Sequence, residues 1–471
     1  MFIALAVVAL PSHDVVADDD DEDDDDAWFR PPSAFFLAPS DEDFPVTRQS
    51  LVELGRNLFF DKELSGNRNI SCAGCHSPLI GTSDGLSLNL GEGASGLSTT
   101  RDAGTYPPQA DAPLERGGRN TPALFNVGAF EFRRLMHDGR FERDPWSPDG
   151  LLTPAGDELP PGFETPLEAL SVFPFVNHQE MLGQPGENDM ADASVASSDG
   201  DDDQDIVTTL PFEGVWNIVV ARVAAIPEYR QQLLDAYPEL DEDLDNLGIL
   251  HIGRALAHYQ TATFRSLNSP FHRYLRGDRR AMSAEARRGF RLFKGRAGCT
   301  GCHSGPYLTD HDFHAIGIPQ IGPGFDEAGR DGREDFGREN ESGDPADRYR
   351  FRTPSLINVA LTGPWGHDGA YSTLEGVVRH HLQPEHSLRH YDPAQRILPP
   401  RADLDARDLV ALRNADTTDA IARRIEIRPR RLSSRQFDYL MAFLNALTDP
   451  AAFALRNGVP HRVPSGLTLV D

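Results

Sequence analysis

Cysteine is scarce in this 471-residue chain, and none is left over for a disulfide framework. All four cysteines lie in the stretches "SCAGCHSP" and "AGCTGCHSGP", as Cys72, Cys75, Cys299 and Cys302, and the histidines that follow them are His76 and His303. Two thiols three residues apart, followed at once by a histidine, form the attachment pattern of a c-type haem. The histidine of such a motif becomes the proximal ligand of the iron.

The alternatives are a zinc site or a redox dithiol. Zinc needs its remaining ligands at short spacing, whereas the two cysteine pairs lie far apart and each carries its own histidine. A redox dithiol needs no histidine at that position. We therefore predict two covalently bound haem c groups.

Long apolar runs are also missing. The N-terminal run "FIALAVVAL" is too short to span a bilayer, and with the following "DVVA" it indicates a signal peptide over residues 1–17. No basic residue precedes the run, so the start of this signal peptide is expected to be truncated. Because c-type haem is attached after export, we expect a periplasmic protein without a membrane span.

Positive charge is scarce: the chain has 45 lysines and arginines but 73 aspartates and glutamates, and the formal net charge is −28. So acidic a chain argues against a nucleic-acid partner. The acids cluster in an N-terminal segment, 18–44, and in an insertion at 186–206. Charge runs of this density are usually solvated and unstructured. The alternative is a docking surface for a basic electron donor or protein substrate, or loose cation binding.

Strand patterns are few, and the strongest periodicity is helical. Helices are predicted over 215–226, 247–264 and 437–449. The stretches that lead into the two haem motifs also share a G-x-x-L-F run with helical spacing, which indicates a duplicated haem domain. Long segments rich in glycine, proline and aspartate separate these elements. The predicted class is mostly α, with two cytochrome c-like haem domains and long irregular loops.

The predicted organisation has two haem domains and a tail. The N-terminal haem domain is expected over 45–212 and includes the acidic insertion. The C-terminal haem domain is expected over 213–450, and a tail over 451–471.

Beyond the haem motifs, the stretches "RNTPALFNVGAF", "HDGRFE", "FPFVNHQEM" and "FRTPSLINVALTGPWGHDGAYSTLEGVV" resemble the bacterial di-haem cytochrome c peroxidases and their relative MauG. The resemblance extends over about residues 45–450. It implies that the N-terminal haem, with proximal His76, is the peroxide site. Glu180 would be the distal carboxylate that moves a proton between the peroxide oxygens, and Pro174 the distal proline. The glutamine that the family carries ten residues earlier is Leu170 here.

Histidine is absent from residues 77–136, where many of these peroxidases carry a loop histidine that blocks the peroxide site until the other haem is reduced. We therefore predict that the first iron is five-coordinate, or bears only water, without reductive activation.

The resemblance makes the C-terminal haem, with proximal His303, the electron-transfer centre. Its second ligand, a methionine in classical peroxidases and a tyrosine in MauG, lies nineteen residues after the threonine of a T-x-P pair. Counting from Thr362 gives His381. Bis-histidine ligation would lower the potential relative to a methionine-ligated haem. His380 is the alternative ligand, and it also stays open that both are ordinary helix residues and another group binds.

Three further positions are implied by the resemblance. His137 stands where the family places an interhaem tryptophan; an imidazole is a poor hopping relay, although it can hydrogen-bond or simply cap a propionate. A calcium ion would be bound by the side chain of Asn120 and by the carbonyls of Thr362 and Pro364, an all-oxygen set that suits this hard cation. Arg352 would pair with a haem propionate.

The predicted function is that of a periplasmic di-haem peroxidase. It would reduce hydrogen peroxide to water with electrons from a small cytochrome c, a cupredoxin or a quinol. One alternative is a MauG-like oxidase that modifies a partner protein, although the axial tyrosine and interhaem tryptophan are missing. The other is a non-catalytic di-haem electron carrier. The sequence leaves open whether the chain forms a homodimer.

Overall fold

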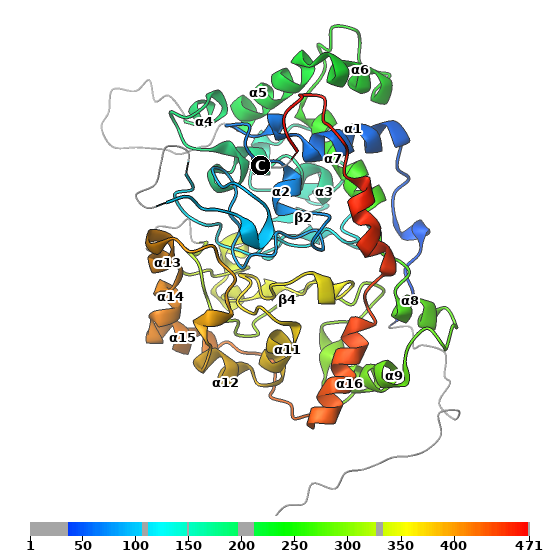
Figure 1. Ribbon diagram of the computed structural model, residues 1–471, viewed down its shortest axis with the longest axis vertical. Coiled ribbons are helices and arrows are strands. Elements are labelled where there is room, and N and C mark those ends of the chain that lie inside the picture. Colours follow the sequence, from blue (N-terminus) through cyan, green and yellow to red (C-terminus); the bar gives the residue numbers. More distant parts are fainter. Residues whose placement is uncertain (1–35, 106–111, 148–149, 196–211, 326–332, 470–471) are drawn as a thin grey trace, which may run out of the picture.

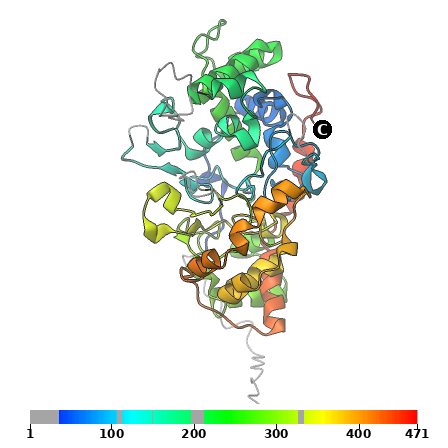
Figure 2. The ribbon, with the colours of Figure 1, turned by 90° about the vertical axis from the view of Figure 1, so that its left-hand side faces the viewer.

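A computed structural model describes residues 36–105, 112–147, 150–195, 212–325 and 333–469. The predicted signal peptide, most of the acidic N-terminal segment and the second half of the acidic insertion lie outside these residues. The molecule is elongated, with two helical halves at opposite ends of its long axis and loops and short strands between them (Figures 1 and 2).

Helices make up most of the regular structure, as predicted. In the first half they are α1 (Gln49–Phe60), α2 (Cys72–Cys75), α3 (Pro166–Leu170), α4 (Asp189–Ala193), α5 (Phe212–Ala225), α6 (Pro227–Ala236) and α7 (Ile249–Thr263). The second half contains α8 (Pro270–Leu275), α9 (Ala284–Lys294), α10 (Glu339–Ser342), α11 (Leu374–Leu382), α12 (Pro384–Arg389), α13 (Ala402–Asp408), α14 (Val410–Arg413), α15 (Ala415–Ala422) and α16 (Ser434–Asn445). The predictions over 215–226, 247–264 and 437–449 are confirmed by α5, α7 and α16.

The strands are two or three residues long. They are β1 (Arg134–Leu135), β2 (Phe141–Arg143), β3 (Leu151–Leu152), β4 (Phe313–His314) and β5 (Phe351–Arg352). Strands β1, β2 and β3 form one antiparallel sheet in that order, and β4 pairs with β5 in another. Such short strands contribute little core and serve mainly to position loops near the middle of the molecule.

The repeated G-x-x-L-F run has the same packing role in both halves. Helix α1 packs against α7, and α9 packs against α16. A Cβ atom on Gly55 would lie 2.0 Å from the carbonyl oxygen of Ala255, and one on Gly289 would lie 1.8 Å from that of Tyr439. Only glycine allows backbones to approach this closely. The glycine of the repeat is therefore required by the helix crossing that precedes each haem motif.

Two hydrophobic cores accompany the two halves. The first contains Leu51 and Leu58 of α1 together with buried residues of α5, α6 and α7, such as Trp216. The second joins Phe290 and Phe293 of α9 to α11 and α16. Residues 212–264 thus pack with the N-terminal half. We therefore propose that the domain boundary lies between α7 and α8, later in the chain than the sequence suggests.

The C-terminal tail returns to the first half. Val463 is part of the first core, and the Ser465 hydroxyl donates to the carboxylate of Asp61, 2.6 Å away. Among the residues described, no helix combines the length and apolar character that crossing a bilayer would require.

The long loop after the first haem motif is held by a segment of the second half. The Ser87 amide donates to the carbonyl of Ile397 at 2.9 Å, and the Ile397 amide donates to the Ser87 hydroxyl at 2.8 Å. Arg401 donates to the carbonyl of Ala103 at 2.8 Å. Arg116, wholly buried, forms an ion pair with Asp408. Residues 396–408 therefore hold this loop in place at several points.

Candidate haem and peroxide site

The first haem motif forms the short helix α2, and His76 follows at its C-terminus. The Nδ1 atom of His76 lies 3.2 Å from the carbonyl oxygen of Thr82. A carbonyl can only accept, so Nδ1 carries the proton and Nε2 remains as the ligand atom. Burial lowers the pKa of His76 to about 4, which keeps the imidazole in the neutral form that binds a metal. The motif therefore fits a covalently attached haem.

Glu180 lies in a π-helical turn, His178–Leu182, directly after Asn177. The Asn177 side-chain oxygen accepts from the amides of Gln179 and Glu180, and its amide nitrogen lies 3.4 Å from the Glu180 carboxylate. Asn177 thus fixes both the backbone and the carboxylate. Single π-helical turns are often found at functional sites. Asn177 was not predicted as a site residue, although it stands inside the "FPFVNHQEM" stretch.

The Glu180 carboxylate is close to the first haem motif. Burial raises the pKa of Glu180, and the nearby Arg140 guanidinium opposes this rise. Burial also raises the pKa of the thiols of Cys72 and Cys75 to about 12, and the charge of Glu180 contributes to both shifts. The structure therefore brings together Glu180 and the haem-attachment residues, which are about a hundred residues apart in sequence.

Neighbouring segments pack around the turn that carries Glu180. A Cβ on Gly91 would lie 2.1 Å from the carbonyl oxygen of Gln179, so the loop after the first haem motif packs directly on the π-helical turn. Pro174 begins the 3₁₀ turn just before Asn177. Leu170, at the family's glutamine position, packs against the first hydrophobic core and offers no polar atom to the site.

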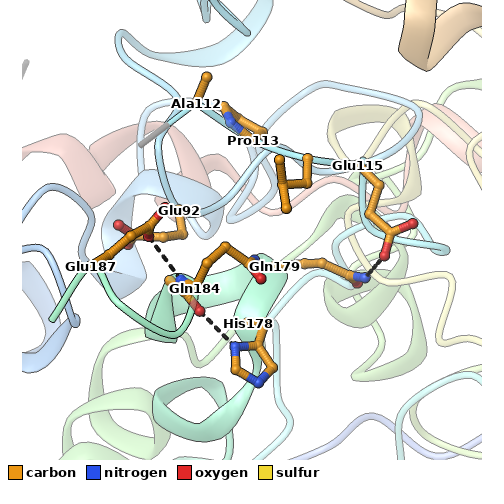
Figure 3. Close-up of a pocket in the computed structure, with 10 residues that line it drawn as sticks. Glu92, Ala112, Pro113, Glu115, His178, Gln179, Gln184 and Glu187 are labelled. Atoms are coloured by element: carbon orange, nitrogen blue, oxygen red, sulfur yellow. Dashed lines mark hydrogen bonds between the residues drawn. The ribbon is translucent and has the colours of Figure 1, made fainter. Parts of the chain in front are cut away.

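A cavity of about 240 Å³ borders the same π-helical turn (Figure 3). It is lined by Glu92, Ala112, Pro113, Leu114, Glu115, His178, Gln179, Gly183, Gln184 and Glu187. The Gln179 amide donates to Glu115 across its wall, and His178 Nδ1 donates to the carbonyl of Gly183 at 2.6 Å. Glu180 is not among the lining residues, although its neighbour Gln179 is.

The second haem motif places two imidazoles opposite each other. His303 Nδ1 donates to the carbonyl of Leu308 at 3.0 Å, and His381 Nδ1 donates to that of Val377 at 2.8 Å. The two ring centroids are 6.5 Å apart. Two imidazole–metal bonds of about 2 Å each, with the ring radii added, require roughly this separation. The pair therefore fits the two axial positions of one haem iron.

His380 is oriented differently. Its Nε2 atom lies 2.9 Å from the carbonyl of Ile316, and its Nδ1 lies 2.9 Å from the Tyr371 hydroxyl. Both ring nitrogens are therefore used within the protein, and the geometry favours His381 over His380 as the ligand.

Residues between the two halves form a connected network of hydrogen bonds to backbone carbonyls. Arg352 donates from its amide to the carbonyl of His137 at 2.7 Å and from Nε to that of Met136 at 2.9 Å. His137 Nε2 lies 3.1 Å from the carbonyl of Asn120, whose amide donates to His367 at 2.8 Å. Burial lowers the pKa of His137 to about 4, so this imidazole is neutral.

Of the predicted calcium ligands, Asn120 belongs to this network. The Asn120 side-chain nitrogen donates to the carbonyl of Leu86 at 2.8 Å. The side-chain oxygen of Asn120 therefore points away from Leu86. The bond from the Asn120 amide to His367 brings Asn120 next to the segment that begins with Thr362 and Pro364. Side-chain and carbonyl oxygens are the donors that calcium prefers.

A buried ion network that sequence analysis missed joins the same halves. Arg119 donates from Nε to Asp335 at 2.6 Å and also forms an ion pair with Asp138. Asp138 in turn accepts from Arg140. Arg119 and Asp138 each adjoin a residue that the sequence did single out, but no sequence pattern indicated Asp335.

Among the residues described, Cys302, Asp310 and His314 form the one cluster of three side chains with metal-ligand atoms close together. Because Cys302 belongs to the second haem motif, its sulfur would form a thioether bond to the haem. The cluster therefore does not form a separate metal site. The four cysteines form no disulfide.

The chain is similar to several known proteins. The family described as di-haem cytochrome c peroxidase matches residues 49–280. The chain is 31% identical to the methylamine utilization protein MauG of Methylorubrum extorquens over 361 residues, which cover 76% of this chain and 74% of that protein. It is 26% identical to the cytochrome-c peroxidase IdrP2 of a Pseudomonas strain, over 71% of this chain and 73% of that protein.

Solved structures show the same fold. The chain resembles a MauG-like protein associated with microbial copper homeostasis with a TM-score of 0.52 and 23% identity, over 92% of this chain and 98% of that one.

Proposed function

The chain belongs to the di-haem cytochrome c peroxidase family that includes MauG, and from this premise we propose that it is a periplasmic peroxidase. It reduces hydrogen peroxide to water, using electrons that a small redox donor delivers through the C-terminal haem. A cytochrome c, a cupredoxin or a quinol has the chemistry such a donor needs. Membership of the family makes the chain an oxidoreductase with two haem c groups.

The observation that carries the proposal is the contrast between the two haem motifs. The first has a buried carboxylate, Glu180, as its polar neighbour, whereas the second has His381 facing His303. A carboxylate leaves an iron position open to a small oxidant, and an imidazole at bonding distance closes it. We infer that the first haem binds peroxide and the second transfers electrons.

At the first haem, a bound iron would supply the site that holds peroxide and accepts its oxidising equivalents. Glu180 takes the proton from one peroxide oxygen and returns it to the other, so that the departing oxygen leaves as water. A raised pKa suits a group that must both accept and donate a proton near neutral pH. Asn177 holds the carboxylate in place through its amide.

At the second haem, His303 and His381 would hold the iron through Nε2, with each Nδ1 anchored to a backbone carbonyl. Such anchoring fixes the ring orientation and raises the basicity of the ligand. Arg352 is the proposed propionate partner, and His137 supports the interhaem region by hydrogen bonding.

We also propose a calcium ion bound by Asn120, Thr362 and Pro364. It would couple the interhaem segment to α11, which carries His381. Chelation followed by back-titration with calcium is the test: a reversible loss of thermal stability is expected, and an unchanged melting curve would rule the ion out.

A second candidate function is oxidation of a partner protein. It is favoured by the 31% identity to a MauG protein, which is higher than the identity to IdrP2. The histidine at position 137 and the absence of an axial tyrosine speak against a close functional match.

Peroxide turnover with reduced cytochrome c as donor distinguishes these functions. Rapid turnover is expected, and Glu180→Gln should lower it by roughly 10²–10⁴-fold because the proton shuttle is lost. The matched control is Glu187→Gln, which changes a carboxylate of the neighbouring cavity and should leave turnover nearly unchanged. Slow turnover accompanied by oxidation of added protein would instead support the MauG-like function. If the protein does not react with peroxide at all, a non-catalytic electron carrier would be supported.

A further inference from the structure

A tyrosine and a histidine form a buried hydrogen-bonded pair beside the second haem motif. Tyr371 precedes α11, and His380 lies on that helix, one residue before His381. The Tyr371 side chain is 1% exposed and His380 is fully buried. The phenol oxygen lies 2.9 Å from His380 Nδ1 and 2.8 Å from the Ser387 hydroxyl. The peroxidase reaction proposed above uses none of these groups.

The direction of the proton in this pair follows from its third partner. His380 Nε2 lies 2.9 Å from the carbonyl of Ile316, which can only accept, so Nε2 carries the proton of the neutral ring. His380 Nδ1 is therefore an unprotonated acceptor, and the phenol of Tyr371 donates to it. Ser387 is then left to donate to the phenol oxygen.

The pair lies between the proposed axial ligand and a less buried tyrosine. The ring centroids of His381 and His380 are 6.1 Å apart, and those of His380 and Tyr371 are 5.3 Å apart. Tyr391, which is only half-buried, packs edge-on against Tyr371 at 5.6 Å. Aromatic rings thus form a continuous series from His381 to the edge of the second core.

We propose that Tyr371 is a one-electron redox site of the C-terminal half, with His380 as its proton acceptor. This proposal rests on the peroxidase function, which supplies hydrogen peroxide as the oxidant. After the haem pair has reacted with peroxide, Tyr371 gives up one electron to it by way of the His303–His381 centre, its O–H bond breaks, and an N–H bond forms at His380 Nδ1. The products are a neutral tyrosyl radical and an imidazolium. Of the two electrons that peroxide takes, one comes from Tyr371 and the other from the haem centres.

The physical reason is the acidity of an oxidised phenol. Once the electron has left, the hydroxyl proton is held so weakly that its transfer to an imidazole in contact lowers the energy of the oxidised state, although one charge stays buried in either case. A basic nitrogen already hydrogen-bonded to the hydroxyl lets the proton move without rearrangement of the protein. Tyr371 can therefore hold an oxidising equivalent when the donor is absent, and Tyr391 offers the next ring toward the surface. Donation of one electron restores the phenol, and the proton returns from His380.

The test is electron paramagnetic resonance of the oxidised holoprotein, frozen shortly after mixing with hydrogen peroxide in the absence of a donor. We expect an organic radical signal that narrows when the protein contains ring-deuterated tyrosine. The signal should be lost in Tyr371→Phe. It should also be lost in His380→Gln, because glutamine can keep both hydrogen bonds but cannot accept the proton.

The matched control is Tyr307→Phe. Tyr307 is also buried, and its hydroxyl has no hydrogen-bond partner within the described part of the chain, so the radical signal should persist without it. Retention of the low-spin signal of the second haem verifies that each variant is folded around its cofactor.

Haem absorption recorded on the same samples separates the two proposals. A radical that persists in Tyr371→Phe would overturn the assignment. So would a change in haem absorption on addition of peroxide without any tyrosyl signal, and the peroxidase function would then stand. No absorption change at all would contradict both.

Discussion

Histidine side chains in this protein differ in what their ring nitrogens bind. His76, His303 and His381 each donate from Nδ1 to a backbone carbonyl and keep Nε2 for a metal. His380 and His137 have Nε2 directed at a carbonyl instead. The ring nitrogen that faces the backbone thus distinguishes the three proposed iron ligands from His380 and His137, but not from His178, which also donates from Nδ1.

Replacing His381 by glycine is expected to convert the second haem from low-spin to high-spin, because the sixth ligand is removed. The measurement is the optical and electron paramagnetic resonance spectrum of the oxidised protein. His380→Gln, the matched control at the adjacent position, should remain low-spin. A low-spin second haem in His381→Gly would mean that another side chain binds the iron.

The pH dependence of the reaction with peroxide should report Glu180. As the base that takes the peroxide proton, Glu180 must be ionised, so the rate should fall as pH decreases through its pKa. Because burial raises this pKa, the fall should lie above about pH 4.3, the ordinary value for glutamate. Arg140→Gln removes the cation that opposes the rise and should move the fall to still higher pH.

The second-order rate constant for peroxide, measured against pH in both proteins, checks this expectation. An unshifted profile, or a shift to lower pH, would show that Arg140 does not act on the catalytic carboxylate.

At the scale of elements, each haem motif follows a helix that crosses a partner at a glycine. The crossings of α1 with α7 and of α9 with α16 are equivalent, and each uses the glycine of the G-x-x-L-F run. The first cysteine of the motif follows the end of α1 by twelve residues and the end of α9 by five. In both halves the motif therefore extends from a tightly packed helix pair.

Gly289→Ala should destabilise the second half by about 1–3 kcal/mol, because the added methyl group meets the Tyr439 carbonyl at a distance that forces the helices apart. Chemical denaturation followed by circular dichroism measures the loss. Gly458→Ala is the control, since a Cβ there meets no atom within 4 Å. Equal stability of the two variants would contradict the close crossing.

Local sequence patterns predicted the haem-attachment residues but not the long-range contacts of the site. The haem motifs could be recognised from their local pattern, whereas Glu180 and His381 were expected from the family resemblance and remain proposed site residues. The partner of Arg119, Asp335, lies far away in the sequence, and no periodicity indicates such a pair. For the same reason, helical patterns identified α5 and α7 but did not reveal that both belong to the first core.

At the scale of the whole molecule, the two halves are joined through buried charge. Arg119 connects Asp138 of the first half to Asp335 of the second. Burial alone would raise the pKa of Asp335, but the Arg119 guanidinium outweighs it and holds this pKa below its usual range. The interface is therefore stabilised by the ionised carboxylate.

The contribution of Asp335 should disappear in acid. Its folded pKa is below the unfolded value of about 3.9, so the stabilisation is complete above that pH and is lost as the pH falls further. Asp335→Asn should cost about 3–5 kcal/mol at pH 7, because a buried partner of Arg119 is lost. The difference from the unaltered protein, measured by chemical denaturation, should shrink below about pH 4.

Asp419→Asn is the control for charge loss, because its ion pair with Arg389 is exposed and should contribute little at any pH. An Asp335→Asn protein as stable as this control would show that the network does not hold the halves together.

Low-temperature electron paramagnetic resonance of the fully oxidised, untreated protein tests the central claim most directly. An open first iron beside Glu180 and a second iron closed by His303 and His381 predict one high-spin and one low-spin ferric signal in equal amounts. Two low-spin signals would contradict the account, because both irons would then be closed to peroxide.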